Sequence, residues 1–295
     1  MTSTGKTLKG SCILRINGVY DSLKTADKRL ADFILHNTER IVNFTIVELA
    51  ENSNTSYATI SRFCRKIGFS GFKELKNNLT SDILASKNLE EMIDGFTINS
   101  NASTEQVCER VYKLSSKILE ESMAIIDYLA IDLAVEKLTS AKNVFFIGAG
   151  ASGISARYAY SKFFRIGIPC YHEADSTLYK MKVSILTEND VLFVISSSGR
   201  TAEIVECARV ASANNIYVIS LSDFAISPLT KVSNTNLYTT PRNANLFLDI
   251  DMPLIIGQIT IIDILYSCCC LKMSEKSSSL YNKTKQSTDA EKLKF

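Results

Sequence analysis

The six residues Ser196–Thr201, Ser-Ser-Ser-Gly-Arg-Thr, carry the clearest chemical pattern in the chain. They follow the apolar run Val191–Ile195, which is typical of a strand buried on both faces, and they precede the helical pattern Ala202–Ala213. The free amides and positive dipole end at the start of such a helix favour an anion, and four hydroxyls lie beside them. No lysine follows the glycine, as it does in nucleotide-binding P-loops. The loop therefore predicts a phosphate site, although an ordinary serine-rich turn uses the same residues.

A second glycine-rich loop, Gly148–Gly153, follows the expected strand Asn143–Ile147 and begins a helix that ends near Arg165. Its glycines allow a positive φ and a close approach of a ligand to the backbone. The loop also matches the G-x-G-x-x-G dinucleotide pattern, with Glu173 and Asp175 where a ribose-binding acid would lie. A dinucleotide site gives no reason for the hydroxyls of the other loop. Two loops at the carboxyl ends of neighbouring parallel strands would instead face one small pocket, and both interpretations stay open.

The N-terminal part of the chain carries a third pattern. Thr45 and Glu48 form a capping-box pattern at the start of a short helix, and Ser56 is expected to cap the next helix. Ala50 is small where the two helices would cross, and Asn54 tolerates the left-handed backbone that the turn requires. This spacing is typical of a helix-turn-helix, whose second helix enters the major groove of DNA. A small helical bundle with a charged face gives the same pattern.

The outward face of that second helix supplies candidate DNA contacts. Ile60 and Phe63 are expected to pack inward, so the polar residues around them face out. Arg62 is suited to guanine or phosphate, and the nearby lysines are suited to backbone phosphates. The predicted DNA-binding residues are Ser56, Tyr57, Thr59, Ser61, Arg62, Arg65, Lys66, Lys73 and Lys76.

Helices in the N-terminal part of the chain, and alternating strands and helices in the rest, must position these residues. Residues 1–20 are expected to be weakly ordered, and helices are expected over Thr25–His36 and from Phe72 to Leu84. A helical stretch capped by Ser103 and Gln106 is expected to continue to about Leu138. Beyond it, strands alternate with helices, which indicates right-handed crossovers and a parallel sheet covered on both faces. The strands are expected around Val144–Ile147, Ile168–Tyr171, Leu192–Ile195, Ile216–Leu221 and Asn236–Thr239, before a last helix over Met252–Lys272.

The predicted fold is therefore an all-α helix-turn-helix domain followed by a doubly wound α/β domain with a parallel five-stranded sheet. The expected boundaries are 1–86 for the helical domain, 87–102 for a polar linker, 103–273 for the α/β domain and 274–295 for a polar C-terminal tail. Residues 1–90 hold 13 Lys and Arg against 9 Asp and Glu, whereas residues 91–273 hold 15 against 19. A basic N-terminal module beside an acidic one is compatible with nucleic acid at the N-terminus.

Composition narrows the class of protein further. The 295 residues are 46% hydrophobic and 22% charged, which is enough to form a sizeable core. The first twenty residues have no continuous apolar core of a signal peptide, and the apolar stretch Leu254–Leu271 is interrupted by Gln258 and Asp263, so we expect a buried helix and no membrane partner. The eight cysteines and the two histidines lack metal-ligand spacing, so we expect reduced buried thiols, no metal site and a cytoplasmic protein.

Together these residues resemble the RpiR family of transcriptional regulators. The run Leu49–Phe72, which contains Arg-Phe-Cys-Arg-Lys, is similar to the N-terminal domain of that family. The segments Gly148–Gly153, Phe164–Gly167 and Ser196–Thr201 are similar to the SIS (sugar isomerase) domain that follows it there. The resemblance covers roughly Leu23–Leu271. It implies a regulator that binds a double-stranded DNA operator and senses a phosphorylated sugar, as a homodimer or homotetramer and without a cofactor.

The resemblance also implies which residues hold the effector. Ser152, Ser196, Ser198 and Thr201 would hold the phosphate in such a domain. The full predicted effector site is Gly150, Ser152, Gly153, Ser196, Ser197, Ser198, Gly199 and Thr201.

The chain departs from the family near the last helix. Where relatives carry a Ser-Arg pair, this chain has Leu254-Ile255, ahead of Gln258 and the run Ile261–Asp263. Phosphate capture stays expected, and both the identity of the sugar and whether a sugar binds stay open.

Three function classes follow from these patterns: a sugar-phosphate-responsive regulator, a dinucleotide-sensing regulator and an isomerase that uses the same pocket. An isomerase needs a base beside the carbonyl carbon, and Glu203, His172 and Glu173 are the candidates. His172 is expected to be a polar residue at a sheet edge, and Glu203 a charge at a helix N-terminus. A chain with a DNA-binding module is first a sensor, so we predict a regulator with no catalytic residue.

Overall fold

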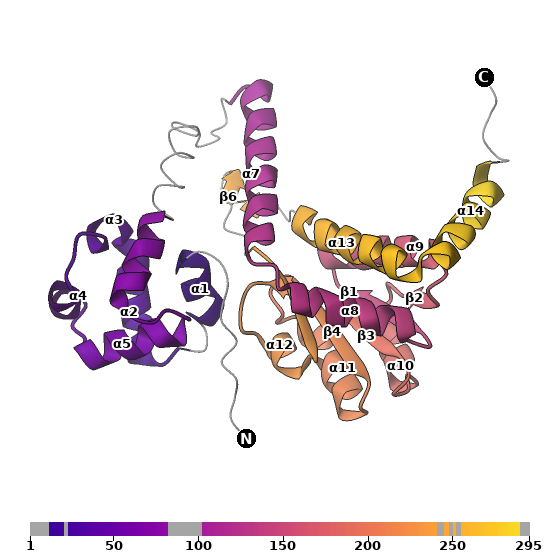
Figure 1. The fold of residues 1–295 in the computed structure, drawn as a ribbon, viewed down its shortest axis with the longest axis horizontal. Coiled ribbons are helices and arrows are strands. Elements are labelled where there is room, and N and C mark those ends of the chain that lie inside the picture. Colours follow the sequence, from indigo (N-terminus) through magenta and orange to yellow (C-terminus); the bar gives the residue numbers. More distant parts are fainter. Residues whose placement is uncertain are drawn as a thin grey trace. The chain divides into compact units, whose positions relative to one another are not determined.

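The computed structural model describes residues 12–20, 23–81, 102–240, 245–247, 250–251 and 255–289 (Figure 1). The chain divides into two compact units, one built mainly from residues up to Ile125 and the other mainly from Ile126 onward. The expected linker, 87–102, lies outside the described residues except for Ala102. So does Leu254 of the Leu254-Ile255 pair.

The N-terminal unit is helical. Its helices α1 to α5 are followed by a helix that begins at residue 72 and is described as far as residue 81. Leu30, Ile34 and Phe63 are fully buried and belong to one apolar core. The bounds are Cys12–Val19 for α1, Thr25–His36 for α2, Thr38–Ile41 for α3, Ile46–Asn52 for α4 and Tyr57–Lys66 for α5.

The expectation of weak order over residues 1–20 is wrong for helix α1. Cys12, Ile16 and Val19 are almost completely buried and belong to the core of the helical unit. Their spacing of four and three residues places them on one face of the helix. The segment is ordered because it completes an apolar core.

A long helix and a shorter one lead into the second unit. Helix α7 (Thr104–Ala124) begins with the expected capping box of Ser103 and Gln106. The stretch expected to run to Leu138 is interrupted after Ala124, because the Asp127 carboxylate accepts hydrogen bonds from the amides of Leu129 and Ala130 and starts helix α8 (Tyr128–Ser140). An aspartate at the N-cap position is thus the signal that divides the two helices.

The second unit is built on a parallel five-stranded sheet, as the sequence predicts. Its strand order is β2-β1-β3-β4-β5. The strands are β1 (Val144–Gly148), β2 (Cys170–His172), β3 (Val191–Ile195), β4 (Tyr217–Asp223) and β5 (Thr235–Thr239). The helices that follow α8 are α9 (Ala151–Arg165), α10 (Ser176–Ser184), α11 (Ala202–Ala213), α12 (Pro228–Val232), α13 (Ile256–Met273) and α14 (Glu275–Asp289). Strands β6 (Asn245–Phe247) and β7 (Ile250–Asp251) form a short antiparallel pair that belongs to the first unit.

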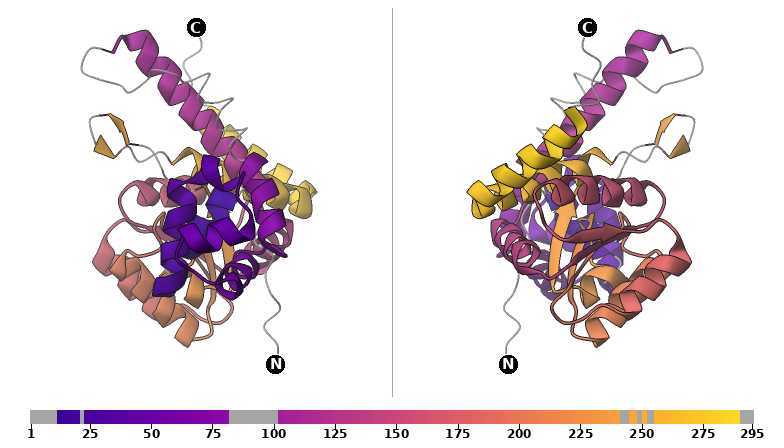
Figure 2. Two further views of the ribbon diagram at one scale, coloured as in Figure 1. Left: turned by 90° about the vertical axis from the view of Figure 1, so that its left-hand side faces the viewer. Right: turned by 90° about the vertical axis from the view of Figure 1, so that its right-hand side faces the viewer.

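Helices cover both faces of the sheet (Figure 2). Phe146 and Phe193 point to the face where α8, α9 and α13 form an apolar core. Phe145 and Leu192 point to the opposite face, where α10 and α11 contribute to a second core. All five residues of β1 and of β3 are buried, as expected for central strands of a doubly wound sheet.

The order of the strands defines the switch point of the sheet, where the direction in which successive strands are added reverses. Strand β2 lies on one side of β1 and β3 lies on the other, so the chain winds both ways from β1. Open α/β sheets bind ligands at the carboxyl ends of the strands on either side of such a switch point. Here those strands are β1 and β3, which end in the two loops that the sequence singles out.

The last two helices differ from each other in composition. Helix α13 is long and apolar enough to cross a membrane by length and hydropathy alone. Its residues Ile261, Ile262 and Leu265 are buried in the core of the sheet, as expected of a packing helix. Helix α14 occupies most of the segment expected to be a polar tail, and Ser277 near its start donates a hydrogen bond to the Cys270 carbonyl oxygen.

Candidate functional sites

The two polar loops lie next to each other. Gly148 at the end of β1 pairs with Ile195 at the end of β3, so the loops that follow begin side by side. The side chains of Ser152 and Ser196 are both almost completely buried. The expectation that the loops follow neighbouring parallel strands is confirmed by this register.

The serine-rich loop has a tight local structure. The Gly199 amide donates to the Ser196 carbonyl oxygen at 3.1 Å, and Gly199 has a φ of +60°. A side chain at Gly199 would also collide with Ser227, so two separate constraints require glycine there. The Ser198 hydroxyl accepts a hydrogen bond from the Arg200 amide at 3.2 Å. Backbone and side-chain contacts thus fix the turn that leads into α11.

The start of α11 has no side-chain cap. Thr201 is the N-cap residue, and its side chain makes no capping hydrogen bond, whereas Ser56 and Asp175 cap their helices. The amides of the first turn of a helix have no partner within the helix, and they form an anion site when no side chain caps them. Within the described chain, the Ser196 and Thr201 side chains also have no hydrogen-bond partner.

A glutamine far along the sequence joins the two loops. Gln258 on α13 is buried, and its Nε2 donates to the Ser197 hydroxyl at 2.9 Å and to the Ser152 hydroxyl at 3.3 Å. Its Oε1 accepts from the Ser155 hydroxyl at 2.7 Å. The structure therefore adds Gln258 to the candidate site. The sequence signal for it is a polar residue that interrupts an apolar helix.

The glycines of the first loop have different roles. A Cβ at Gly148 would lie 2.6 Å from the Ser152 carbonyl oxygen, and a Cβ at Gly153 would lie 3.0 Å from that of Gly148. These two glycines allow α9 to approach β1 closely. Gly150 has a φ of +56° and open space around it, so it serves the turn itself. The Gly153 amide donates to carbonyl oxygens of Ala149 and Gly150.

The acids expected for a dinucleotide site have local partners. The Asp175 carboxylate caps α10 by accepting from the amides of Thr177 and Leu178, at 2.9 Å each. The Glu173 carboxylate accepts from the amides of Ala174 and Asp175. Binding a ribose at either carboxylate would compete with these local bonds.

The isomerase candidates also have defined neighbours. The Nδ1 of His172 lies 3.1 Å from the Phe146 carbonyl oxygen, to which it can only donate. Glu203 lies in the first turn of α11, and its Oε2 is 4.0 Å from the Lys180 Nζ. Among the described residues, no group of three or more His, Cys, Asp or Glu side chains is arranged to hold a metal ion.

In the helical unit, α4 and α5 form the expected helix-turn-helix. Thr45 and Glu48 make the capping box of α4, and the Ser56 hydroxyl accepts from the Thr59 amide at the start of α5. Asn54 in the turn has a φ of +50°. Ala50 is buried in the core of the helical unit.

The predicted DNA-binding residues differ in their solvent exposure and in the contacts that they make. Tyr57, Arg65 and Lys73 are exposed to solvent. The Ser56 and Thr59 hydroxyls lie 3.0 Å apart and belong to the cap of α5. The residues Ser56, Arg62 and Lys66 are also exposed, and those of intermediate exposure are Thr59, Ser61 and Lys76.

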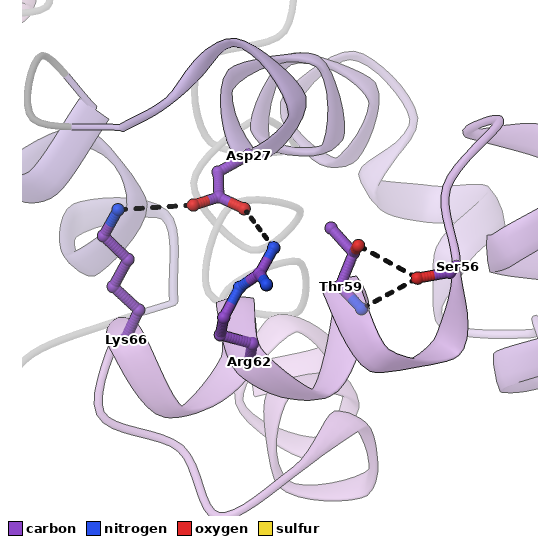
Figure 3. Close-up of polar contacts among 5 residues, drawn as sticks. All are labelled: Asp27, Ser56, Thr59, Arg62 and Lys66. Atoms are coloured by element: carbon purple, nitrogen blue, oxygen red, sulfur yellow. Dashed lines mark hydrogen bonds and ion pairs between the residues drawn. The ribbon is translucent and has the colours of Figure 1, made fainter.

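Three of the predicted cations have partners within the helical unit. The Lys76 Nζ donates to the Phe44 carbonyl oxygen at 2.9 Å. The Arg62 guanidinium lies 3.7 Å from Oδ1 of Asp27, and the Lys66 Nζ lies 3.3 Å from its Oδ2 (Figure 3). Asp27 lies in the first turn of α2 and did not stand out in the sequence, because nothing in its local pattern distinguishes it from a surface acid.

Comparison with known families identifies both units. A family described as the helix-turn-helix domain of the rpiR family matches residues 11–86, and the SIS domain family matches residues 137–256. The two domains together define a helix-turn-helix transcriptional regulator with a SIS domain. The chain belongs to the RpiR family.

Individual relatives agree with this assignment. The chain is 33% identical to an uncharacterized HTH-type transcriptional regulator from Caldanaerobacter subterraneus, with 85% of this chain and 87% of that protein covered. It is 30% identical to the HTH-type transcriptional regulator HexR from Pseudomonas aeruginosa, with coverage of 85% and 86%. The solved structure of the Vibrio vulnificus NanR protein complexed with ManNAc-6P has the same fold, with a TM-score of 0.59, 24% identity and coverage of 96% and 100%.

Proposed function

We propose that this regulator binds a double-stranded DNA operator through α5 and senses a phosphorylated sugar at the carboxyl ends of β1 and β3. The observation that carries the proposal is the uncapped start of α11 beside the Ser196 and Thr201 side chains, at the switch point of the sheet. A sugar phosphate supplies the dianion that such amides and hydroxyls favour. The NanR protein, which has the same fold, was solved with ManNAc-6P.

The contacts divide the proposed effector site into two parts. The phosphate would lie on the first amides of α11 and on the hydroxyls of Ser152, Ser196, Ser198 and Thr201. The sugar would extend toward Ser197, which bonds to Gln258 as Ser152 does. Gly150 and Gly199 shape the two turns, and Gly153 allows α9 to lie close to β1.

The DNA-binding half of the proposal rests on the exposed side of α5. Tyr57, Ser61 and Arg65 follow one another at intervals of four residues, so they share one side of the helix. Arg62 lies beside them with 68% of its side chain exposed. In a helix-turn-helix this surface enters the major groove, while Lys66 and Lys73 would contact phosphates.

The organisation of the whole protein follows from these assignments. We propose that the DNA-binding domain comprises residues 1–86, the linker 87–102 and the SIS domain 103–273, with α14 in the segment 274–295. The protein would act in the cytoplasm as a homodimer or homotetramer. A regulator of this kind needs its two binding events to be coupled, typically by 1–3 kcal/mol.

The effector half can be tested by thermal unfolding and calorimetric titration of the full chain. Sugar phosphates are compared with the same sugars lacking phosphate, with inorganic phosphate and with NAD(H). A ligand that binds only the native state raises its stability by about 2.7 kcal/mol at a hundredfold excess over Kd. Ser198→Ala should remove much of the shift, and Ser212→Ala at the other end of α11 should not. Binding of NAD(H) alone would favour the dinucleotide interpretation.

The coupling is tested with an operator that the protein itself selects from random duplexes. A sugar phosphate that binds must change operator affinity, and the operator must change sugar-phosphate affinity by the same factor. Equal affinities with and without the sugar phosphate would contradict a sensor role. Steady conversion of a sugar phosphate by pure protein, lost in Glu203→Gln, would instead identify an isomerase.

A further inference from the structure

Asp27 is an acid in an unusual position for a DNA-binding unit. It lies in the first turn of α2 and is only 4% exposed, yet both of its charged neighbours come from α5. Among the described residues, its Oδ1 has no hydrogen-bond partner and faces only the Arg62 guanidinium at 3.7 Å. Figure 3 shows the carboxylate between Arg62 and Lys66.

This arrangement differs from an ordinary surface ion pair. Burying a carboxylate is costly unless cations or donors compensate for the lost water, so Asp27 holds Arg62 and Lys66 near α2. The two cations are four residues apart and therefore lie on one side of α5. The Arg62 side chain nevertheless stays 68% exposed. Its guanidinium has five N–H donors in a fixed plane, so one edge can face Asp27 while another faces DNA.

We propose that Asp27 is a positioning residue of the DNA interface, which directs Arg62 so that it reads a base edge. This inference rests on the proposed function of α5. An arginine without such a partner samples many rotamers and loses more entropy when it forms a bidentate contact with guanine. A carboxylate that fixes the guanidinium beforehand reduces that loss for the correct base. It also repels phosphates, which weakens binding to sequences where no base contact compensates.

The proposal predicts opposite effects of one substitution on two kinds of DNA. Asp27→Asn keeps the size of the side chain and removes its charge. Binding to the selected operator should weaken severalfold, because Arg62 is no longer directed. Binding to a scrambled duplex of equal length should strengthen, because a negative charge near the phosphates is lost. The ratio of the two affinities should therefore fall by about tenfold or more.

The experiment measures both affinities of the full-length protein by fluorescence anisotropy at several salt concentrations. Glu51→Gln is the matched control, since Glu51 is an exposed acid on the neighbouring helix α4. Glu51→Gln should change the affinity for both duplexes alike and leave the ratio of the two affinities unchanged. Asp27→Glu should restore part of the ratio. In the Arg62→Ala background, Asp27→Asn should have little further effect on the ratio, as expected of residues that act together.

Several results would overturn the proposal. An unchanged ratio in folded Asp27→Asn protein, or an equal fall of the ratio with and without Arg62, would show that Asp27 does not act through Arg62. Should Asp27→Asn fail to fold, Arg62→Lys decides, because it keeps the charge and loses the planar geometry: it should lower the ratio and keep scrambled-duplex affinity. If neither Arg62→Ala nor Arg65→Ala affects any duplex, the α5 interface itself is wrong. If DNA binding is weakened by Arg65→Ala and not by Arg62→Ala, only the proposed role of Asp27 is overturned.

Discussion

The two candidate sites of this chain are built in opposite ways. On α5 the polar groups include cations and lie on one continuous helix, where Tyr57, Arg62 and Arg65 are exposed. In the SIS domain the hydroxyl and amide side chains are neutral and are brought together from separate loops and from α13, and Ser152, Ser196 and Gln258 are buried. A long polyanion needs an outward surface with cations, whereas a small dianion needs a recess lined by hydroxyls and amides. The predictions below test whether this difference holds.

The largest effect is expected from a core residue of the helical unit. Phe63 is fully buried against the other helices, and Phe63→Ala should cost about 3–5 kcal/mol of stability. DNA binding should be lost, while sugar-phosphate affinity should stay close to that of the wild type. Phe163 lies in the core of the SIS domain, so Phe163→Ala is the matched reverse case. It should abolish sugar-phosphate binding and leave DNA affinity close to that of the wild type. Calorimetry with both ligands checks the pair, and loss of both activities in Phe63→Ala would show that the sites do not fold independently.

A smaller effect is expected where α9 meets β1. A Cβ at Gly148 would lie 2.6 Å from the Ser152 carbonyl oxygen and 3.0 Å from that of Ile195, so backbone must move. Gly148→Ala should therefore cost about 1–3 kcal/mol and displace the Ser152 hydroxyl from Gln258.

Gly150→Ala is the matched control for that close contact. The added methyl group has open space at Gly150, and only the φ of +56° opposes it. Its cost should be about 1–2 kcal/mol, with a smaller loss of sugar-phosphate affinity than in Gly148→Ala. Chemical denaturation and titration of both variants test this. A stronger loss of affinity in Gly150→Ala would mean that the loop, and not the close helix, shapes the proposed effector site.

The difference between a site on one helix and a site assembled from distant segments explains which features the sequence predicts and which it does not. The register of Ile60 and Phe63, the turn at Asn54 and the outward face of α5 are local, so periodicity and capping patterns find them. The central strands β1 and β3 are also found, because their apolar runs are continuous, whereas β2 and β5 are only partly buried. The contacts of Gln258 with Ser152 and Ser197 span 106 and 61 residues, and the contact of Lys66 with Asp27 spans 39. No local pattern encodes such pairs, since only the topology brings them together.

Helix α1 was missed for a related reason. Its eight residues are too few for the periodicity of Cys12, Ile16 and Val19 to be distinguished from chance. The helix is stabilised by the core that it completes, which is tertiary information.

An exposed cation on the DNA-binding side should have a modest and uniform effect. Lys73→Ala should weaken binding to every duplex alike and lower the slope of log affinity against log salt by about one unit, because one phosphate contact is lost. Lys231→Ala, an exposed lysine of α12 in the SIS domain, is the control and should leave the slope unchanged. A sequence-dependent effect of Lys73→Ala would show that this lysine reads bases as well.

The smallest effect is expected at the amino ends of the strands whose carboxyl ends lead into the proposed effector site. Asp190 precedes β3, and its carboxylate accepts hydrogen bonds from the Asn143 side chain at 2.7 Å and from the Thr187 amide and hydroxyl at 2.8 Å each. Burial opposes ionisation of Asp190, but these hydrogen bonds outweigh it and lower the pKa of the carboxyl below its ordinary value. A carboxyl with a lowered pKa in the folded state stabilises the protein above its unfolded pKa of about 3.9, and this contribution disappears as the pH falls through the folded-state pKa.

Wild-type protein should therefore exceed Asp190→Asn in stability near neutral pH, and the difference should shrink as the pH falls below about 4. Unfolding at a series of pH values, with the variant subtracted from the wild type, removes the contribution of other acids. Sugar-phosphate affinity at neutral pH should not change, because Asp190 and Asn143 lie at the opposite ends of β1 and β3 from Ser152 and Ser196. A loss of affinity as large as that of Ser198→Ala would show that the two ends of these strands are coupled. The proposed effector site would then depend on the whole length of the central strands, and the contrast with the locally built surface of α5 would become sharper still.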